Sequence, residues 1–158
     1  MESDDEIRAQ LRTLERAEAA PYTDFRPTPR WFLPAAALWG GALAAFVRLS
    51  RSDSRPAEIV AVVGIIGLAA LIGAYVGWYQ RYHGATPSLL RRKPPEIRRV
   101  MAFYVVGAVV VLAVNALTVA VAPWWVCAGV GFVTAGAGLW WYERAYAAAA
   151  AATKERLA

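Results

Sequence analysis

Four long apolar runs alternate with short polar segments along this chain. The runs are Trp31–Val47, Ile59–Tyr79, Val100–Ala122 and Pro123–Tyr142, and none contains Asp, Glu, Lys, Arg or His. A helix needs about 20 apolar residues to cross a bilayer, at a rise of about 1.5 Å per residue. Membrane-spanning strands would instead need shorter segments of alternating polarity. The pattern therefore predicts four membrane-spanning helices.

Prolines and charges divide the chain further. We expect an all-α integral membrane four-helix bundle preceded by a short cytoplasmic helix. Residues 1–30 are predicted to form an amphipathic helix over 3–20 and a Pro-rich linker over 21–30, because Pro21, Pro27 and Pro29 disfavour a continuous helix. The membrane domain covers 31–146, with helices at about 31–48, 59–80, 98–122 and 123–146. Residues 147–158 form an Ala-rich cytoplasmic tail that continues the last helix.

The N-terminal segment has the signature of a surface helix. Ser3 and Glu6 have the spacing of a capping box, and Ile7, Leu11 and Leu14 fall on one face. Such a face can lie on a membrane surface or pair with another helix. A partly frayed lead-in to the first span explains the same pattern.

The distribution of charge predicts the orientation. The formal net charge is +5, and 14 of the 17 Lys and Arg residues lie on one side if the N-terminus is cytoplasmic. The positive-inside bias therefore predicts that both termini are cytoplasmic, in a multi-pass protein of the cell membrane. Residues 1–30 contain no apolar core of a secretory signal, so the spans themselves direct insertion.

The 80–99 loop is the most basic segment. We expect its cations to contact anionic lipid headgroups, each contributing about 1 kcal/mol, rather than nucleic acid. Orientation of the spans alone is the simpler role. The predicted lipid-contact residues are Arg91, Arg92, Lys93, Arg98 and Arg99.

Two stripes of small residues predict close helix packing. Ala69, Gly73 and Gly77 recur at i, i+4 and i+8 in the second span. The fourth span has a similar line in Cys127, Gly131 and Ala135. Small residues on one face let two helix backbones approach closely, within one bundle or between copies. Glycine is also common in spanning helices, which is the simpler explanation.

Polar residues deep in the spans are few. Asn115 and Thr118 share a face of the third span, and Asn115 is predicted to hydrogen-bond to Thr134 in the fourth. Ion-coupled transporters need an ionisable residue at membrane depth. The small four-span drug exporters, which this chain resembles in length and span count, carry a buried glutamate in their first span. Its absence here argues against a coupled antiporter.

Residues for catalysis or cofactor binding are not evident. His83 is the single histidine and Cys127 the single cysteine, so a His or Cys cluster for a metal or haem is excluded within the chain. The Cys127 thiol should be inert in lipid. We therefore expect no cofactor, no metal and no enzyme activity.

Aromatic residues are expected to form belts at both membrane boundaries, because their rings have an apolar body and a polar edge. Trp124 and Trp125 mark the outer boundary. The inner belt comprises Trp31, Phe32, Trp78, Tyr79, Tyr82, Phe103, Tyr104, Trp140, Trp141 and Tyr142.

The motif Arg30-Trp31-Phe32-Leu33-Pro34, the basic inner loop and the Ala-rich tail give the chain a family resemblance. It resembles small four-span membrane proteins of high-GC, actinobacterial-type bacteria. These families are largely uncharacterised and are often presumed to be accessory or regulatory. The resemblance implies an accessory role and transfers no catalytic residues.

Three functional hypotheses remain from the sequence. The first is a non-enzymatic accessory, regulatory or scaffolding subunit that packs against copies of itself or other membrane proteins. The second is a small transporter or permeability factor that uses Asn115, Thr118 and Thr134. The third is a lipid-modifying membrane enzyme, with a catalytic group from Tyr82, His83 or the 91–99 loop.

Overall fold

The computed structural model describes residues 4–24, 27–83 and 94–157, and the regular structure in these ranges is entirely α-helical. The helices of these ranges are α1 (Asp4–Thr23), α2 (Phe32–Leu49), α3 (Arg55–His83), α4 (Pro95–Val121) and α5 (Trp124–Leu157). Three of them, α2, α3 and α4, are long and apolar enough to cross a membrane. The expected all-α class is confirmed, and the helix composition is that of a membrane protein.

A proline stands at or just before the start of each long helix. Pro34, Pro56 and Pro95 lie in the first turns of α2, α3 and α4, and Pro123 directly precedes α5. The first backbone N–H groups of a helix have no intrahelical partner, so proline costs little there. Glu58 and Glu96 add negative charge to the first turns of α3 and α4, where it interacts favourably with the helix dipole.

α1 and α3 extend beyond their expected bounds, and α5 continues into the predicted tail as expected. α1 continues through Pro21 to Thr23, and the Asp24 N–H donates to the Ala20 carbonyl (2.9 Å) to close its last turn. The linker therefore starts after α1 rather than at residue 21. α5 is one unbroken helix of 34 residues, so the segment predicted as a tail is helical through Leu157. At about 51 Å, α5 is longer than the hydrocarbon core of a bilayer.

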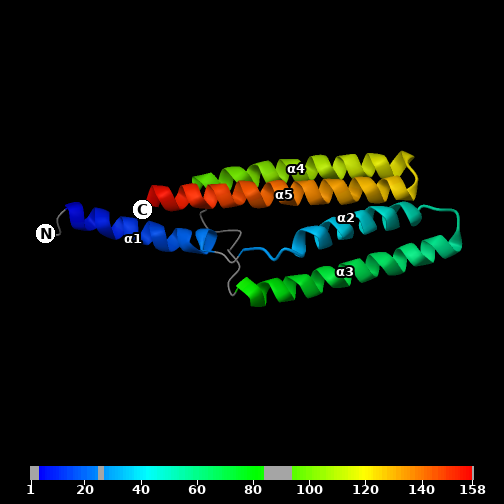
Figure 1. Ribbon diagram of the computed structural model, residues 1–158, viewed down its shortest axis with the longest axis horizontal. Helices are drawn as coiled ribbons and strands as arrows, with labels where there is room; N and C mark the ends of the chain where they lie inside the picture. The colour runs from blue at the N-terminus through cyan, green and yellow to red at the C-terminus, as the bar shows by residue number, and fades with distance from the viewer. Residues whose placement is uncertain (1–3, 25–26, 84–93, 158) are drawn as a thin grey trace.

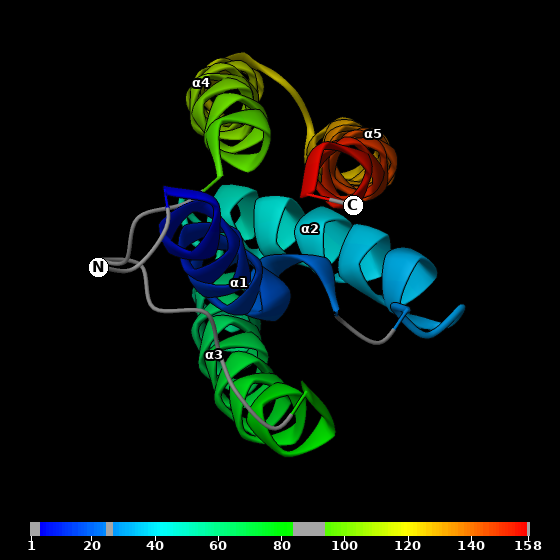
Figure 2. The same cartoon turned by 90° about the vertical axis from the view of Figure 1, so that its left-hand side faces the viewer.

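α2 lies between α3 on one side and the pair α4 and α5 on the other. α4 and α5 are an antiparallel hairpin, α2 packs against α5, and α3 packs against the other side of α2 (Figures 1 and 2). Among the described residues α3 makes no comparable contact with α4 or α5. The helices thus do not enclose one shared core, because α2 lies between α3 and the hairpin.

The start of α1 and the end of α5 lie toward the same end of the long axis of the molecule (Figure 1). α1 runs along the last turns of α5, while the 50–54 and 122–123 turns lie at the opposite end (Figure 1). We refer to these as the terminal end and the turn end. α1 follows the long axis of the molecule, and Ile7, Leu11 and Leu14 are exposed on it.

Candidate functional site

The closest helix contact joins α2 to α5 through small residues. A Cβ added to Gly131 would lie 2.6 Å from the Gly40 carbonyl oxygen and 2.8 Å from the Ala44 Cβ. A Cβ added to Gly40 would lie 2.6 Å from the Ala135 Cβ. The two backbones approach so closely because these positions carry almost no side chain, which is how helices pack tightly without a hydrophobic driving force in lipid.

All three small residues predicted for the fourth span lie on this side of α5. Cys127 and Gly131 are buried, and Ala135 contacts Gly40. The partner helix was not predicted: Gly40, Gly41 and Ala44 of α2 carry the other half of the contact. The signal was present in the sequence as small residues spaced three to four apart in AAALWGGALAA.

The stripe predicted for the second span lies on the surface. Ala69 and Gly73 are exposed, and a Cβ added to Gly73 or Gly77 would meet nothing within 4 Å. α3 contacts α2 elsewhere, where the Phe46 ring covers Gly64. The Ala69–Gly73–Gly77 stripe therefore faces away from the other helices of the described chain. Packing of this stripe against a helix of another molecule stays a prediction.

The polar side chains of the spans form hydrogen bonds with backbone carbonyls of α4 and α5 and with each other. The Asn115 amide donates to Thr134 Oγ1 (3.1 Å) and to the Val111 carbonyl (2.9 Å). The Thr134 hydroxyl donates to the Val130 carbonyl at 2.7 Å. The Thr118 hydroxyl donates within its own helix, to the Val114 carbonyl (2.8 Å). The structure therefore contains the expected Asn115–Thr134 bond, and this bond joins α4 to α5.

The turn end is held by two side chains that reach one carbonyl. Arg48 Nε donates to the Ala122 carbonyl at 2.8 Å, and the buried Cys127 thiol lies 3.7 Å from the same oxygen. The thiol also lies 3.6 Å from the Thr118 carbonyl. Arg48 thus links α2 to the α4–α5 turn, and Cys127 occupies a packed structural position.

At the terminal end, Arg156 connects three helices. Its Nη1 lies 2.7 Å from Glu15 Oε1 on α1, and its Nε lies 2.9 Å from Glu96 Oε1 on α4. These two carboxylates raise the pKa of the Arg156 guanidinium. The pKa of Glu96 is lowered, mainly by the hydrogen bond from its own backbone N–H at the start of α4. Desolvation is the next largest effect and raises this pKa, while Arg156 and Thr153 lower it further.

Further contacts hold α1 against α5. Lys154 Nζ lies 2.8 Å from Asp24 Oδ1, and the Tyr146 hydroxyl donates to the Tyr22 carbonyl at 3.0 Å. Tyr22 packs with Ile97 and Ala149 in a small buried cluster. We call this set of contacts between α1, α4 and α5 the terminal junction.

The predicted lipid-contact residues are described in part. Arg98 and Arg99 are exposed on the first turns of α4, and the Arg99 guanidinium lies 5.9 Å from the centre of the Phe103 ring. Arg91, Arg92 and Lys93 lie outside the described residues.

The inner belt residues make ring contacts at the terminal end. Trp31 and Trp78 join α2 to α3 with ring centroids 5.3 Å apart, and Phe32 stacks on Tyr75 at 5.2 Å. Tyr104 of α4 and Tyr142 of α5 lie 4.6 Å apart. Trp124 and Trp125 are exposed at the turn end. The aromatic residues thus concentrate at two levels along the helices.

One carboxyl group is unusual. Glu143 Oε1 is buried and has no hydrogen-bond partner among the described residues. A buried acceptor without a hydrogen bond lowers stability. No pattern in the sequence singled out Glu143. Across the described ranges, no three His, Cys, Asp or Glu side chains gather in a way that could hold a metal ion.

Comparison of this chain with protein-family models, with curated proteins and with solved structures finds no match. The resemblance inferred from the sequence therefore stays an expectation, and the function is argued from the helices alone.

Proposed function

We propose that the chain is a four-span membrane protein that acts as a non-enzymatic accessory or scaffolding subunit through helix packing with partners. The observation that carries the proposal is the isolation of α3. It contacts α2 on one side and presents the Ala69–Gly73–Gly77 stripe on the other. A stripe of this spacing is the usual contact face between helices in lipid.

The path of the chain supports four crossings. If α2, α3 and α4 each cross the membrane, α5 starts on the side opposite to α1. The ion pairs of Arg156 and Lys154 hold the end of α5 against α1, which supports a return of α5 across the membrane. Its segment from Trp124 to Tyr142 is uncharged. The Trp and Gly residues of this segment make it less apolar than α2, α3 and α4.

The charge distribution supports a cytoplasmic terminal end. Arg98, Arg99, Arg144 and Lys154 lie toward that end, and the positive-inside bias assigns such a side to the cytoplasm. α1 then projects into the cytoplasm with Ile7, Leu11 and Leu14 exposed. This face offers a second contact for a protein partner.

The polar residues favour this proposal over transport. Asn115 and Thr134 are bonded to each other, and Thr118 is bonded to its own helix. The hydrogen bond of Asn115 and Thr134 therefore serves the α4–α5 contact, and that of Thr118 stays within α4.

Chemical crosslinking in native membranes tests the proposal. Gly73→Leu and Gly77→Leu block the stripe without touching the rest of the chain, so crosslinked higher-mass species should be lost. Gly107→Leu on α4 is the matched control, because its Cβ also meets open space. A wild-type protein that crosslinks to nothing, or a Gly107→Leu variant that loses the same species, would contradict the proposal.

A further inference from the structure

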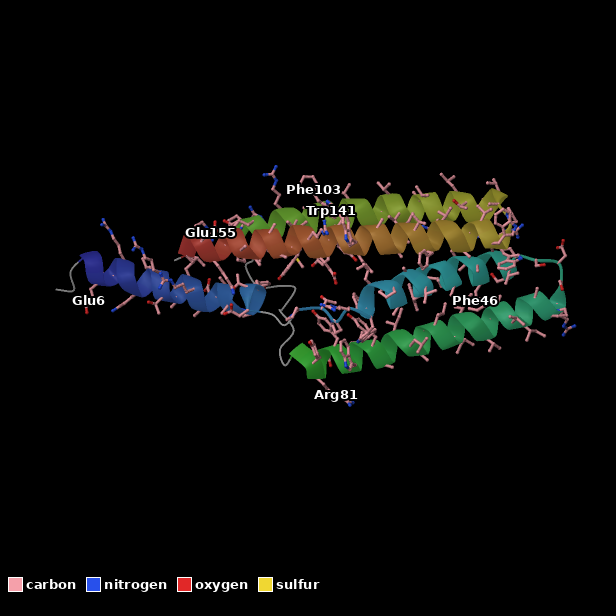
Figure 3. The ribbon with its side chains drawn as sticks, in the orientation of Figure 1. Glu6, Phe46, Arg81, Phe103, Trp141 and Glu155 are labelled. Atoms are coloured by element: carbon pink, nitrogen blue, oxygen red, sulfur yellow. The ribbon has the colours of Figure 1, made fainter. Side chains whose placement is uncertain are left out.

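A groove of about 740 Å³ lies between α2 and α3 on the side away from the α4–α5 hairpin, and its walls are almost wholly apolar. Toward the turn end the gap between the two helices is closed by Phe46, which lies over Gly64 (Figure 3). Toward the terminal end the indole N–H of Trp39 donates to the Leu68 carbonyl (3.2 Å) and ties the helices together beneath the groove. The groove ends at the Trp31–Trp78 ring contact.

The groove has the depth of one lipid leaflet. On α2 its walls extend from Trp31 to Ala42, and on α3 from Leu68 to Trp78. At about 1.5 Å per residue this is roughly 15 Å, half of the ~30 Å hydrocarbon core. The groove therefore occupies the half of the membrane nearest the terminal end.

An arginine lies just beyond the lining residues of each wall, toward the terminal end. On α3 the lining residues Leu71, Ala74 and Trp78 recur at i, i+3 and i+7, and Arg81 continues the same side of the helix by one more turn. Figure 3 shows Arg81 at the terminal end of α3. On α2, Arg30 directly precedes the lining residue Trp31, and both arginines are exposed.

We propose that this groove binds one acyl chain of an anionic phospholipid from the cytoplasmic leaflet, with its phosphate beside Arg30 and Arg81. The inference rests on the four-span topology proposed above. The apolar walls suit an acyl chain, and the two guanidinium groups complement an anionic headgroup. The indole N–H groups of Trp31 and Trp78 lie at the level of the ester oxygens and are donors for them.

A transmembrane helix of a partner fits this groove less well. Such a helix needs a contact along its whole length, but Phe46 closes the gap between α2 and α3 in the other half of the membrane. The Ala69–Gly73–Gly77 stripe, on the opposite side of α3, is the better position for a helix.

Native mass spectrometry of the full chain in mild detergent tests the inference. Phosphatidylglycerol and phosphatidylcholine with identical acyl chains are added in equal amounts. We expect one retained lipid per chain, predominantly phosphatidylglycerol. Ala35→Phe fills the groove from α2 and should lower the retained fraction roughly tenfold. Ala74→Phe fills the groove from α3 and should lower the retained fraction by the same factor. Two variants on different helices separate blocking of the groove from misfolding of a single variant.

Two controls separate the acyl chain from the headgroup. Ala113→Phe adds the same ring to an exposed position of α4 and should leave lipid retention unchanged. The double variant Arg30→Gln, Arg81→Gln should retain lipid but lose its preference for phosphatidylglycerol by roughly tenfold.

Equal lipid retention by wild type, Ala35→Phe and Ala74→Phe would overturn the inference. So would a disulfide between two copies through Leu71→Cys that Ala35→Phe abolishes, because the groove would then hold a second chain. These results would not contradict the four-span topology itself. That topology is tested separately, by thiol labelling in cells.

Discussion

Arg156 and Glu15 are 141 residues apart in the sequence, and their side chains meet at 2.7 Å. The contact brings the first and last helices together at one end of the molecule. Because Arg156 also binds Glu96, one guanidinium holds α1, α4 and α5. The terminal junction therefore holds α1 and the end of α5 at the same end of the molecule. If both lie on one side of a membrane, the helices between them cross it an even number of times.

The first prediction concerns the attachment of α1. Arg156→Gln removes two ion pairs that are largely exposed, each contributing about 0.2–1 kcal/mol. We expect α1 to detach more often from α5. Spin labels at Gln10→Cys and Ala151→Cys should then give a broader distance distribution by electron paramagnetic resonance. Arg144→Gln is the matched control, because Arg144 lies over the Trp140 ring, 4.0 Å from its centre, and does not bridge helices. An unchanged distribution in Arg156→Gln would contradict this role.

The second prediction concerns pH. The pKa of Glu96 is lowered from its ordinary value of 4.5, so the folded protein favours the charged carboxylate. This contribution to stability is present above the ordinary pKa and is lost as the pH falls through the lowered pKa. The free energy of unfolding in mixed micelles should stay constant from neutral pH to about pH 5 and fall at lower pH. Glu96→Gln should reduce that pH dependence, and an equal response of both proteins would refute the assignment.

The third prediction concerns the α2–α5 contact. Gly131→Ala places a Cβ 2.6 Å from the Gly40 carbonyl oxygen, so the helices must separate. We expect a loss of about 1–3 kcal/mol in the free energy of unfolding. Gly129→Ala is matched in helix and chemistry but adds its Cβ to open space, so it should be neutral or slightly stabilising. Unfolding in mixed micelles, followed by circular dichroism, measures both. Equal stability of the two variants would be inconsistent with this contact.

The fourth prediction concerns the polar pair between α4 and α5. A double-mutant cycle of Asn115→Leu and Thr134→Val should give a coupling energy of about 0.6–2 kcal/mol. The cycle is measured by the same unfolding assay. Thr118→Val should show no coupling to Asn115→Leu, because the Thr118 hydroxyl donates to its own helix. If Thr118→Val couples to Asn115→Leu as strongly as Thr134→Val does, the coupling does not come from the Asn115–Thr134 hydrogen bond, and the prediction is wrong.

The helices could be predicted from the sequence because their determinants are local. Uncharged runs define the long helices, and prolines mark their starts. The Asn115–Thr134 bond was also predictable, because these are two of the few polar residues within the apolar runs on either side of the short turn at 122–123. A buried polar group in an apolar run favours a polar partner on the neighbouring helix.

The partners of the stripes could not be predicted, because several helices carry small residues at the same spacing. Gly40 and Ala44 of α2 meet Gly131, whereas Gly73 of α3 faces outward. The pattern on each helix is alike, and the choice between them depends on how all helices pack together. The Arg156–Glu15 contact was unpredictable for a similar reason, since charged residues are frequent in both segments.

The most direct test of the proposed topology is labelling of single cysteines by a membrane-impermeant thiol reagent in intact cells. The native Cys127 is buried and serves as background. We predict that Asp53→Cys, in the turn after α2, reacts in intact cells. Thr28→Cys and Glu155→Cys, at the terminal end, should react only after the membrane is permeabilised. Labelling of Glu155→Cys in intact cells would show that α5 does not return to the cytoplasm and would contradict the account.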